Sequence, residues 1–186
     1  MISEEVTTAL GKSIKPKLKG CHSWSKFWIK SLTVLGVMIL SGSLFATRYR
    51  IVGDPQEVRC IPAYSVYLVD LKDIDLERGN LYMFKSNDLS PIYEKDTNML
   101  KYLRGLPGDT VEIQANEQVL INGKYTEFGL SLANEKLGTA KDEFVGSAEL
   151  ADNQYWFLGT SPKSFDSRYW GSVTKEQIVG RAYPLF

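Results

Sequence analysis

Lys101-Tyr-Leu-Arg-Gly-Leu-Pro-Gly-Asp109 is the segment that decides the fold of this chain. It places one lysine among apolar neighbours and then ends in a run of glycine and proline. Glycine permits positive φ at a corner of a turn, and proline fixes its own φ there. The segment therefore predicts a β-strand that carries a lysine and ends in a tight turn.

Short runs of β-forming residues lie on both sides of this segment. Turn signals separate them, and Asn122-Gly123 is the strongest of these signals. The pattern predicts a mainly β domain without a long helical period. The expected strands are Val66–Val69, Leu81–Phe84, Thr110–Ile113, Val119–Ile121 and Tyr155–Leu158. The expected turns are 78–80, 107–109, 122–123 and 160–162.

An uncharged apolar segment, Ser31–Thr47, precedes the β-rich part. As a helix it would span roughly 26 Å, near the lower limit for crossing a bilayer. A cleaved signal peptide is the alternative, because Ser41 and Ser43 are small residues with loosely suitable spacing for cleavage. The polar lead-in of about 30 residues is long for a signal peptide, so we expect an uncleaved anchor.

The anchor divides the chain into a basic segment 1–30, the membrane span 31–47 and a β-rich domain 48–186. Within that domain, residues 127–150 are polar and weakly patterned, and we treat them as an inserted excursion from the sheet. The two flanks of the anchor differ in charge. Residues 1–30 hold six lysines and two glutamates, although the whole chain balances 22 basic against 22 acidic residues.

This asymmetry predicts the orientation in the membrane. Lysine-rich flanks stay in the cytoplasm, so the basic segment faces inward and the β-rich domain faces outward. We therefore expect a single-pass protein of the plasma (inner) membrane, with a periplasmic domain in a Gram-negative cell. Membrane lipid is then one partner. The balanced total charge argues against nucleic acid as a partner, because phosphate binding needs a basic surplus.

The residue inventory limits the chemistry available to an enzyme. The chain has one histidine, His22, and two cysteines, Cys21 and Cys60. His22 precedes the anchor, so a bilayer would separate it from the outer domain and no Ser-His-Asp triad can form there. We expect no metal and no cofactor. A nucleophile activated by lysine remains possible, with Lys101 as the candidate amine, although a solvated edge-strand lysine is the ordinary alternative.

Several segments resemble the type I signal peptidases. The first segment quoted above resembles their lysine box, in which the general-base lysine stands four residues before the first glycine. Ser164-Phe-Asp-Ser-Arg-Tyr-Trp-Gly171 resembles a second box, and Arg78-Gly-Asn-Leu-Tyr-Met-Phe84 a third. Val119-Leu-Ile-Asn-Gly-Lys124 is similar to the family's strand and turn after the lysine box. The resemblance covers roughly residues 30–186, in the family's order.

The resemblance implies a signal-peptidase-like β-rich catalytic domain behind one transmembrane helix. Members are membrane-anchored serine endopeptidases with a Ser/Lys dyad that remove leader peptides. The substrate partner would be a precursor protein with small residues at positions −3 and −1 of its leader. The short chain with one anchor resembles the conjugative-transfer branch, which processes pilin precursors.

One box departs from the family pattern. Arg59-Cys60-Ile61-Pro62 stands where the family has its nucleophilic serine, so Cys60 occupies the serine position. We expect a Cys60/Lys101 dyad, in which a thiol, being more acidic than an ammonium, favours a thiolate beside a charged lysine. Two alternatives remain open: an inactive homologue that has lost its serine, and another serine, of which Ser65 is the nearest.

The resemblance assigns further roles by position. Ser164 matches the hydroxyl that orients the lysine amine, and the backbone N–H of Cys60 matches an oxyanion donor. The residues expected to support the site are Asp166, Arg168, Gly105 and Asp109. The candidates for contact with the peptide are Ile61, Pro62 and Tyr64, with ordinary core burial as the alternative.

Two further readings stay open beside hydrolysis. An acyl transfer to an amine would cyclise a pilin instead of hydrolysing it. A non-catalytic, membrane-anchored assembly or substrate-binding factor would keep the groove without the reaction; Cys60 favours that rival, whereas Lys101 and Ser164 argue against it.

Overall fold

The structure is a computed structural model that describes residues 24–54, 56 and 59–186. Most of the predicted basic segment, with Cys21 and His22, lies outside the described residues. The described chain divides into two compact units between Gly42 and Ser43.

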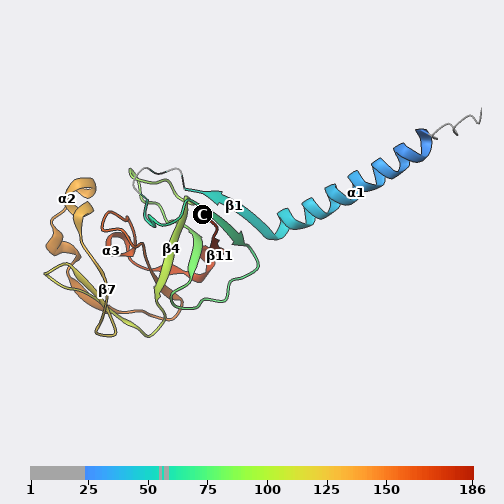
Figure 1. Ribbon diagram of the computed structural model, residues 1–186. Coiled ribbons are helices and arrows are strands. Elements are labelled where there is room, and N and C mark those ends of the chain that lie inside the picture. Colours follow the sequence, from blue (N-terminus) through green and yellow to red (C-terminus); the bar gives the residue numbers. More distant parts are fainter. Residues whose placement is uncertain (1–23, 55, 57–58) are drawn as a thin grey trace, which may run out of the picture. The chain divides into compact units, whose positions relative to one another are not determined.

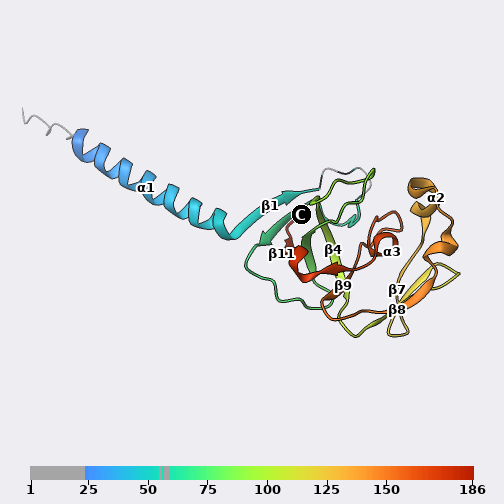
Figure 2. The same cartoon turned by 180° about the vertical axis from the view of Figure 1, so that it is seen from behind.

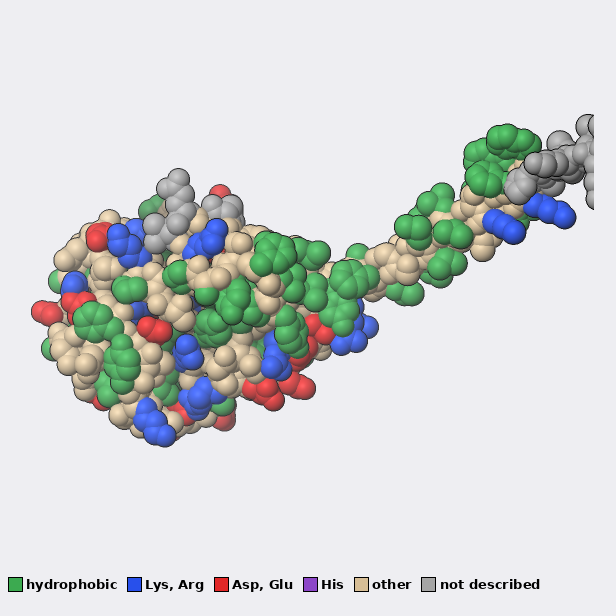
Figure 3. Space-filling model, in the orientation of Figure 1, with side chains coloured by type: hydrophobic (Ala, Val, Ile, Leu, Met, Phe, Trp, Pro, Cys, Tyr) green, Lys and Arg blue, Asp and Glu red, His purple; other side chains and the backbone are tan. Residues whose placement is uncertain are grey.

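Helix α1, Trp24–Arg48, contains the whole predicted span and extends it at both ends. Its 25 residues would reach about 37 Å at 1.5 Å per residue, enough to cross a hydrocarbon core. None of its residues is buried, and hydrophobic side chains cover its surface (Figure 3). By length and composition α1 could span a membrane, a test that a signal sequence would also pass.

Seven strands form the larger sheet, and all of their pairings are antiparallel. Strand β4, which carries Lys101, lies in its interior between β3 and β9 (Figure 1). The order across the sheet is β1 (Tyr49–Gly53), β2 (Val66–Asp70), β11 (Ile178–Pro184), β3 (Leu81–Lys85), β4 (Asn98–Gly105), β9 (Gln154–Leu158) and β10 (Val173–Thr174).

Four strands form a smaller antiparallel sheet, in the order β7 (Lys124–Phe128), β6 (Gln118–Ile121), β5 (Thr110–Ile113) and β8 (Gly146–Glu149). In both ribbon views β7 lies on the opposite side of the β-rich unit from β11 (Figure 2). The mainly β prediction is confirmed, and each of the five expected strands lies within an observed one.

The predicted excursion, residues 127–150, differs from the structure at both ends. Residues 127–128 belong to β7, and β8 pairs with β5, so the excursion returns to the smaller sheet. Between these strands the chain forms helix α2 (Ser131–Leu137) and a 3-10 helix, η1 (Lys141–Phe144). Leu132 and Ala133 are the buried residues of α2, and their burial stabilises this helix within an otherwise polar segment. The other short helices are α3 (Ser167–Trp170) and η2 (Lys175–Gln177).

Strand β3 explains how the core is built around the site. All four residues from Leu81 to Phe84 are buried, although successive side chains point to opposite faces of a strand. Leu81 and Met83 pack with β2 and β11, whereas Tyr82 and Phe84 pack with Met99, Leu103 and Phe157. Both faces of the sheet are therefore covered at β3. The neighbouring strand β4 lies beside a region from which water is largely excluded.

Candidate active site

Lys101 is buried in the middle of the larger sheet. Its residue is 5% exposed, and its Cα partner on β3 is Tyr82. The strand on the other side is β9, so the alternative of a solvated edge-strand lysine is wrong. An amine held in this position loses most of its hydration, which is costly for a structural lysine without a partner.

Gly159 creates space beside Cys60. It follows Leu158, whose Cα partner on β4 is Tyr102, the residue after Lys101. A Cβ on Gly159 would come within 2.8 Å of the Cys60 carbonyl oxygen and closer still to Ser164 Oγ. A glycine here lets the backbone of Cys60 and the side chain of Ser164 approach the end of β9 together.

The backbone of Cys60 is fixed by the loop after β9. Its carbonyl oxygen accepts hydrogen bonds from the N–H groups of Thr160 (3.0 Å) and Ser161 (3.2 Å). Its side chain is a free thiol and is partly exposed. Cys60 Sγ donates a weak hydrogen bond to Gln56 Oε1 at 3.8 Å. The peptide carbonyl is therefore held while the thiol stays accessible.

Cys60 and Lys101 line the same groove. One part of it, about 250 Å³, lies between the end of β1 and the first half of β4. A second part, about 400 Å³, continues past Cys60 toward α2. Four residues line both parts: Gln56, Cys60, Tyr93 and Phe165. We name these two parts together the Cys60 groove.

The reactive polar atoms have few partners. Ser164 Oγ is buried without a hydrogen-bond partner among the residues that the structure describes. Within the same residues no hydrogen bond joins Lys101 Nζ to Cys60 Sγ or to Ser164 Oγ. Cys60 and Lys101 therefore share the groove, and Ser164 Oγ lies near the Cys60 carbonyl oxygen, but the direct bonds that the family resemblance implies are not formed among the described residues. Their roles stay predictions.

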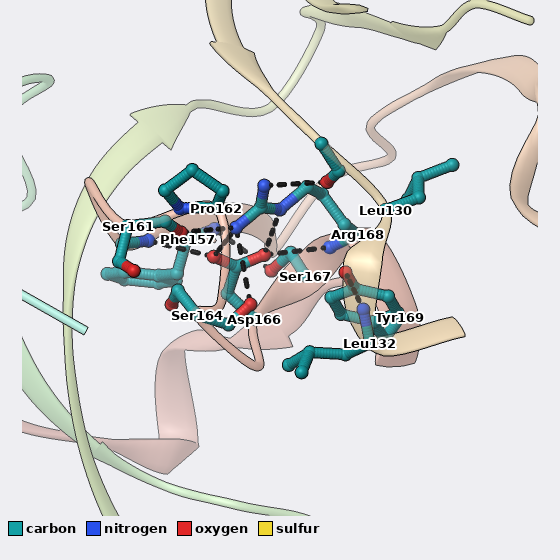
Figure 4. A network of polar contacts seen from close by, with 12 residues as sticks. Leu130, Leu132, Phe157, Ser161, Pro162, Ser164, Asp166, Ser167, Arg168 and Tyr169 are labelled. Carbon is teal, nitrogen blue, oxygen red and sulfur yellow. Dashed lines mark hydrogen bonds and ion pairs between the residues drawn. The ribbon is translucent and has the colours of Figure 1, made fainter. Parts of the chain in front are cut away.

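Asp166 and Arg168 form an ion pair, drawn together with Ser164 in Figure 4. Both side chains are fully buried, and Arg168 Nε donates to Asp166 Oδ1 at 2.8 Å while Nη2 donates to Oδ2 at 2.8 Å. Burial alone would lower the pKa of Arg168, but the hydrogen bonds and charge of Asp166 outweigh it and leave that pKa raised. Arg168 therefore keeps its charge in the buried pair.

Arg168 also ties distant segments together. It donates to the carbonyl oxygens of Phe128 and Gly129 at the end of β7, and to those of Ser161 and Ser164 in the loop beside Cys60. Asp166 Oδ2 accepts from the N–H of Gly159. The ion pair therefore positions the backbone on which Ser164 and the Cys60 contacts depend.

Asp109 performs a similar bracing role at the turn after β4. Its carboxylate accepts from the N–H of Leu106 (2.6 Å) and from Asn122 Nδ2 (2.7 Å), and it pairs with Arg78 at 2.7 Å. Burial would raise the pKa of Asp109, but these three donors outweigh it and hold that pKa below its usual range. The Asp109 carboxylate therefore connects three predicted turns, 78–80, 107–109 and 122–123.

Gly105 ends β4 where a side chain has no room. A Cβ there would lie 2.8 Å from Leu150 Cδ1 and from Trp156 Cβ. The ladder between β4 and β9 also shifts register between Leu103 and Gly105. Glycine lets the strand pack closely at this bulge.

The residues proposed to contact peptide lie elsewhere. Ile61 is buried in the core with Tyr67 and Val69, and Tyr64 packs against the same cluster. Pro62 is exposed. Among the described residues that line the groove, none of Ile61, Pro62 and Tyr64 occurs, so their contact with substrate stays a prediction.

Ser65 is the alternative nucleophile that the sequence offers. Its Oγ donates to the carbonyl oxygen of Phe186 at 3.1 Å, and it does not line the groove. Cys60 is thus the better placed of the two candidates.

Sequence reasoning missed several residues of the groove. Gln56 and Tyr93 lie in loops without a strong local pattern, and Gly159 follows a strand without a turn motif of its own. Phe165 stood inside a recognised box, so its place beside Ser164 could have been inferred. The missed residues are brought to the groove by tertiary packing, which local patterns do not encode.

The profile of a known family agrees with this architecture. The family described as "Signal peptidase, peptidase S26" matches residues 24–186. The chain belongs to this family. The match includes α1 and every element of both sheets, so the family likeness extends beyond the quoted boxes.

Individual signal peptidases match with different coverage. A "Probable signal peptidase I-2" of Synechocystis sp. is 32% identical over 114 residues, 60% of this chain and 49% of that protein. This match therefore spans about half of its relative. A "Signal peptidase I" of Bacillus amyloliquefaciens is 29% identical over 170 residues, 86% of each chain. The crystal structure of a signal peptidase I from Enterococcus faecalis V583 shares 28% identity, covering 57% of this chain and 96% of that chain, with a TM-score of 0.36.

Proposed function

We propose that the protein is a membrane-anchored endopeptidase that removes leader peptides with a Cys60/Lys101 dyad. The observation that carries the proposal is the shared groove, which Cys60 and Lys101 line together. Ser164 Oγ, buried without a partner among the described residues, lies near the Cys60 carbonyl oxygen. Membership of the signal peptidase family supports the reaction class.

The first step forms an acyl-enzyme. Cys60 Sγ attacks the scissile carbonyl carbon as a thiolate, and the carbonyl oxygen takes the negative charge of the tetrahedral intermediate. In this account the backbone N–H of Cys60, which has no acceptor among the described residues, donates to that oxygen. The C–N bond then breaks, and Lys101 gives its proton to the leaving amine.

The second step releases the leader. Neutral Lys101 removes a proton from water, and the resulting hydroxide attacks the thioester carbon. The C–S bond breaks, so the products are a carboxylic acid, the Cys60 thiolate and the Lys101 ammonium. In this account Ser164 Oγ orients the amine in both steps. Pilin cyclisation would need a different thioester, one that carries the carbonyl carbon of the pilin itself; the amino terminus of the same pilin would attack that carbon in place of water, and the C–S bond would break to release the Cys60 thiolate.

The substrate is a peptide in an extended conformation. Part of the Cys60 groove lies between Val52–Asp54 and Asn98–Lys101, and a peptide strand laid there would meet β-strand backbone on either side. We propose leader peptides with small residues near the scissile bond. The Cys60-Ile61-Pro62 sequence, which resembles the Ser-Met-Pro box of the conjugative branch, supports pilin precursors of a conjugative system as the substrate.

The proposed location follows from α1 and the flanking charge. The six lysines before or early in α1 favour the cytoplasm for the N-terminal end, which puts residues 48–186 outside the plasma membrane. In a Gram-negative cell this is the periplasmic side. A reporter that works only outside the membrane, fused after Phe186, should be active; activity only of a cytoplasmic reporter would contradict the orientation.

The rival function is a non-catalytic factor that binds the leader without cutting it. A processing assay with the full-length protein in vesicles separates the two. Wild type should cleave a pilin precursor, Cys60→Ala should bind it without cleavage, and Cys60→Ser should retain partial activity. Binding without cleavage by wild type would favour the rival.

A further inference from the structure

Gln56 bridges the Cys60 groove. Its Oε1 accepts the weak hydrogen bond from Cys60 Sγ at 3.8 Å, and its Nε2 donates to Tyr93 Oη at 3.3 Å. One side-chain amide therefore contacts the reactive sulfur on one side and a phenol on the other. Both contacts come from loops, so the bridge is a product of tertiary structure.

Both ends of this bridge are held in place. The backbone N–H of Gln56 donates to Asp54 Oδ1 at 3.0 Å, and Asp54 N–H donates to the Ser65 carbonyl at 2.9 Å. The Tyr93 ring lies against Phe165, with ring centroids 5.8 Å apart, and Lys136 Nζ lies 5.3 Å from the Tyr93 centroid. The amide thus approaches the sulfur from a supported position.

We propose that Gln56 is a catalytic residue whose amide N–H donates a hydrogen bond to the Cys60 thiolate, and that Tyr93 is the positioning residue that holds it there. The proposal rests on the proposed function of Cys60 as a nucleophile. It adds a neutral donor to the charge stabilisation that Lys101 supplies.

The hydrogen-bonding groups balance in both ionisation states. With a thiol, Cys60 donates to Oε1 and Nε2 donates to the Tyr93 oxygen, as observed. With a thiolate, Cys60 can only accept, so the amide turns by half a rotation and Nε2 donates to the sulfur. Tyr93 then donates its O–H to Oε1, because a phenol can both donate and accept. No donor or acceptor of the bridge is lost in the exchange.

Other charged groups around Cys60 act on its ionisation as well. Lys101 and Asp54 line the first part of the groove, and Glu135, Lys136 and Lys163 line the second. Arg59 is the neighbour in sequence. Burial raises the pKa of nearby Tyr67 to about 12, so this phenol stays neutral through the working range. The effect of Gln56 must therefore be measured in variants that leave these other charged groups unchanged.

The test is the rate of Cys60 alkylation by iodoacetamide as a function of pH. Full-length protein carrying Cys21→Ser is used, so that Cys60 is the thiol observed. Gln56→Glu sets a carboxylate against the thiolate and should shift the midpoint upward by about one pH unit or more. Gln56→Ala removes the donor and should shift it less. Tyr93→Phe keeps the ring and should produce a smaller shift in the same direction.

Gln118→Glu is the matched control, because it makes the same charge change on β6 of the other sheet. Its midpoint should equal that of the parent. Gln56→Ala should also lower kcat for leader cleavage with little change in KM, a split that a merely structural role does not predict. Unchanged alkylation profiles in Gln56→Glu and Gln56→Ala would overturn the proposal. Absence of cleavage by wild type would contradict the peptidase function separately, since alkylation needs no substrate.

Discussion

Arg168 and Lys101 are two buried basic side chains with opposite surroundings. Arg168 has a carboxylate partner and donates to four backbone carbonyl oxygens. Lys101 is 5% exposed, yet its amine has no hydrogen bond or ion pair within the described part of the chain. Desolvation is costly for both cations, but only one of them receives compensating bonds.

The difference separates a structural role for Arg168 from a chemical role for Lys101. A saturated ion pair fixes loops and leaves no proton free to move. The Lys101 amine has no hydrogen bond or ion pair among the described residues, so it is free to bind a reacting group in the groove that it lines. Ser164 follows the same division, because its carbonyl oxygen belongs to the Arg168 network while its buried Oγ is left open.

Lys101→Met should produce the largest effect, and only on activity. The substitution removes the proton carrier, so cleavage should fall on the order of 10²–10⁴-fold. Stability should hold or rise, because an apolar side chain of similar length replaces a buried amine. Cleavage rates and thermal unfolding of the full-length protein check both parts. If Lys101→Met still cleaved the precursor but unfolded at a lower temperature than wild type, Lys101 would have the structural role that is assigned to Arg168.

Arg168→Ala should act on stability instead. It leaves Asp166 buried without its partner, which costs roughly 3–5 kcal/mol of folding free energy. Lys85→Ala is the control: its pair with Asp96 is 3.9 Å long and exposed, so its loss should be barely measurable. Equal denaturation midpoints for the two variants would show that the buried network does not hold the loops.

Ser164→Ala should divide the two properties within one residue. Its Oγ has no partner among the described residues, so stability should change little. If Oγ binds the Lys101 amine during the reaction, cleavage should lose about 1.5–3 kcal/mol of transition-state stabilisation. Kinetics and unfolding on the same sample measure this. Full activity in Ser164→Ala would remove the serine from the site.

Asp109→Asn should give a smaller effect that depends on pH. The folded-state pKa of Asp109 is lowered, so its contribution is complete above the unfolded carboxyl pKa of about 3.9 and is lost as pH falls through the folded value. The variant should be less stable by about 1–3 kcal/mol at neutral pH. The deficit should shrink in acid. A deficit independent of pH would contradict the role of the carboxylate charge.

The sequence predicted the parts of the fold that depend on local residue patterns. Strand β3 is an unbroken apolar run because both of its faces are covered, and Asn122-Gly123 has positive φ at both residues, as a tight turn requires. Strand β8 was missed, because Gly146–Glu149 is exposed along its whole length and carries no alternation. Pairing with β5 alone makes it a strand.

The candidate site was also predicted only in part. Lys101, Ser164, Asp166 and Arg168 stood in boxes that could be read from the sequence. The bridge from Gln56 to Tyr93 joins residues 37 positions apart, and only the folded chain brings them together. Burial of Ile61 also depended on tertiary packing, since an apolar residue beside a nucleophile fits a groove and a core equally well.

The central claim, that Cys60 is the nucleophile served by Lys101, is tested most directly by trapping the acyl-enzyme. Full-length protein is mixed with a precursor, quenched in acid and analysed by mass spectrometry. The account predicts a leader fragment joined to Cys60 as a hydroxylamine-sensitive thioester in wild type, and none in Cys60→Ala. Cleavage of the precursor by folded Cys60→Ala at the wild-type rate, with no adduct on wild-type Cys60, would contradict it.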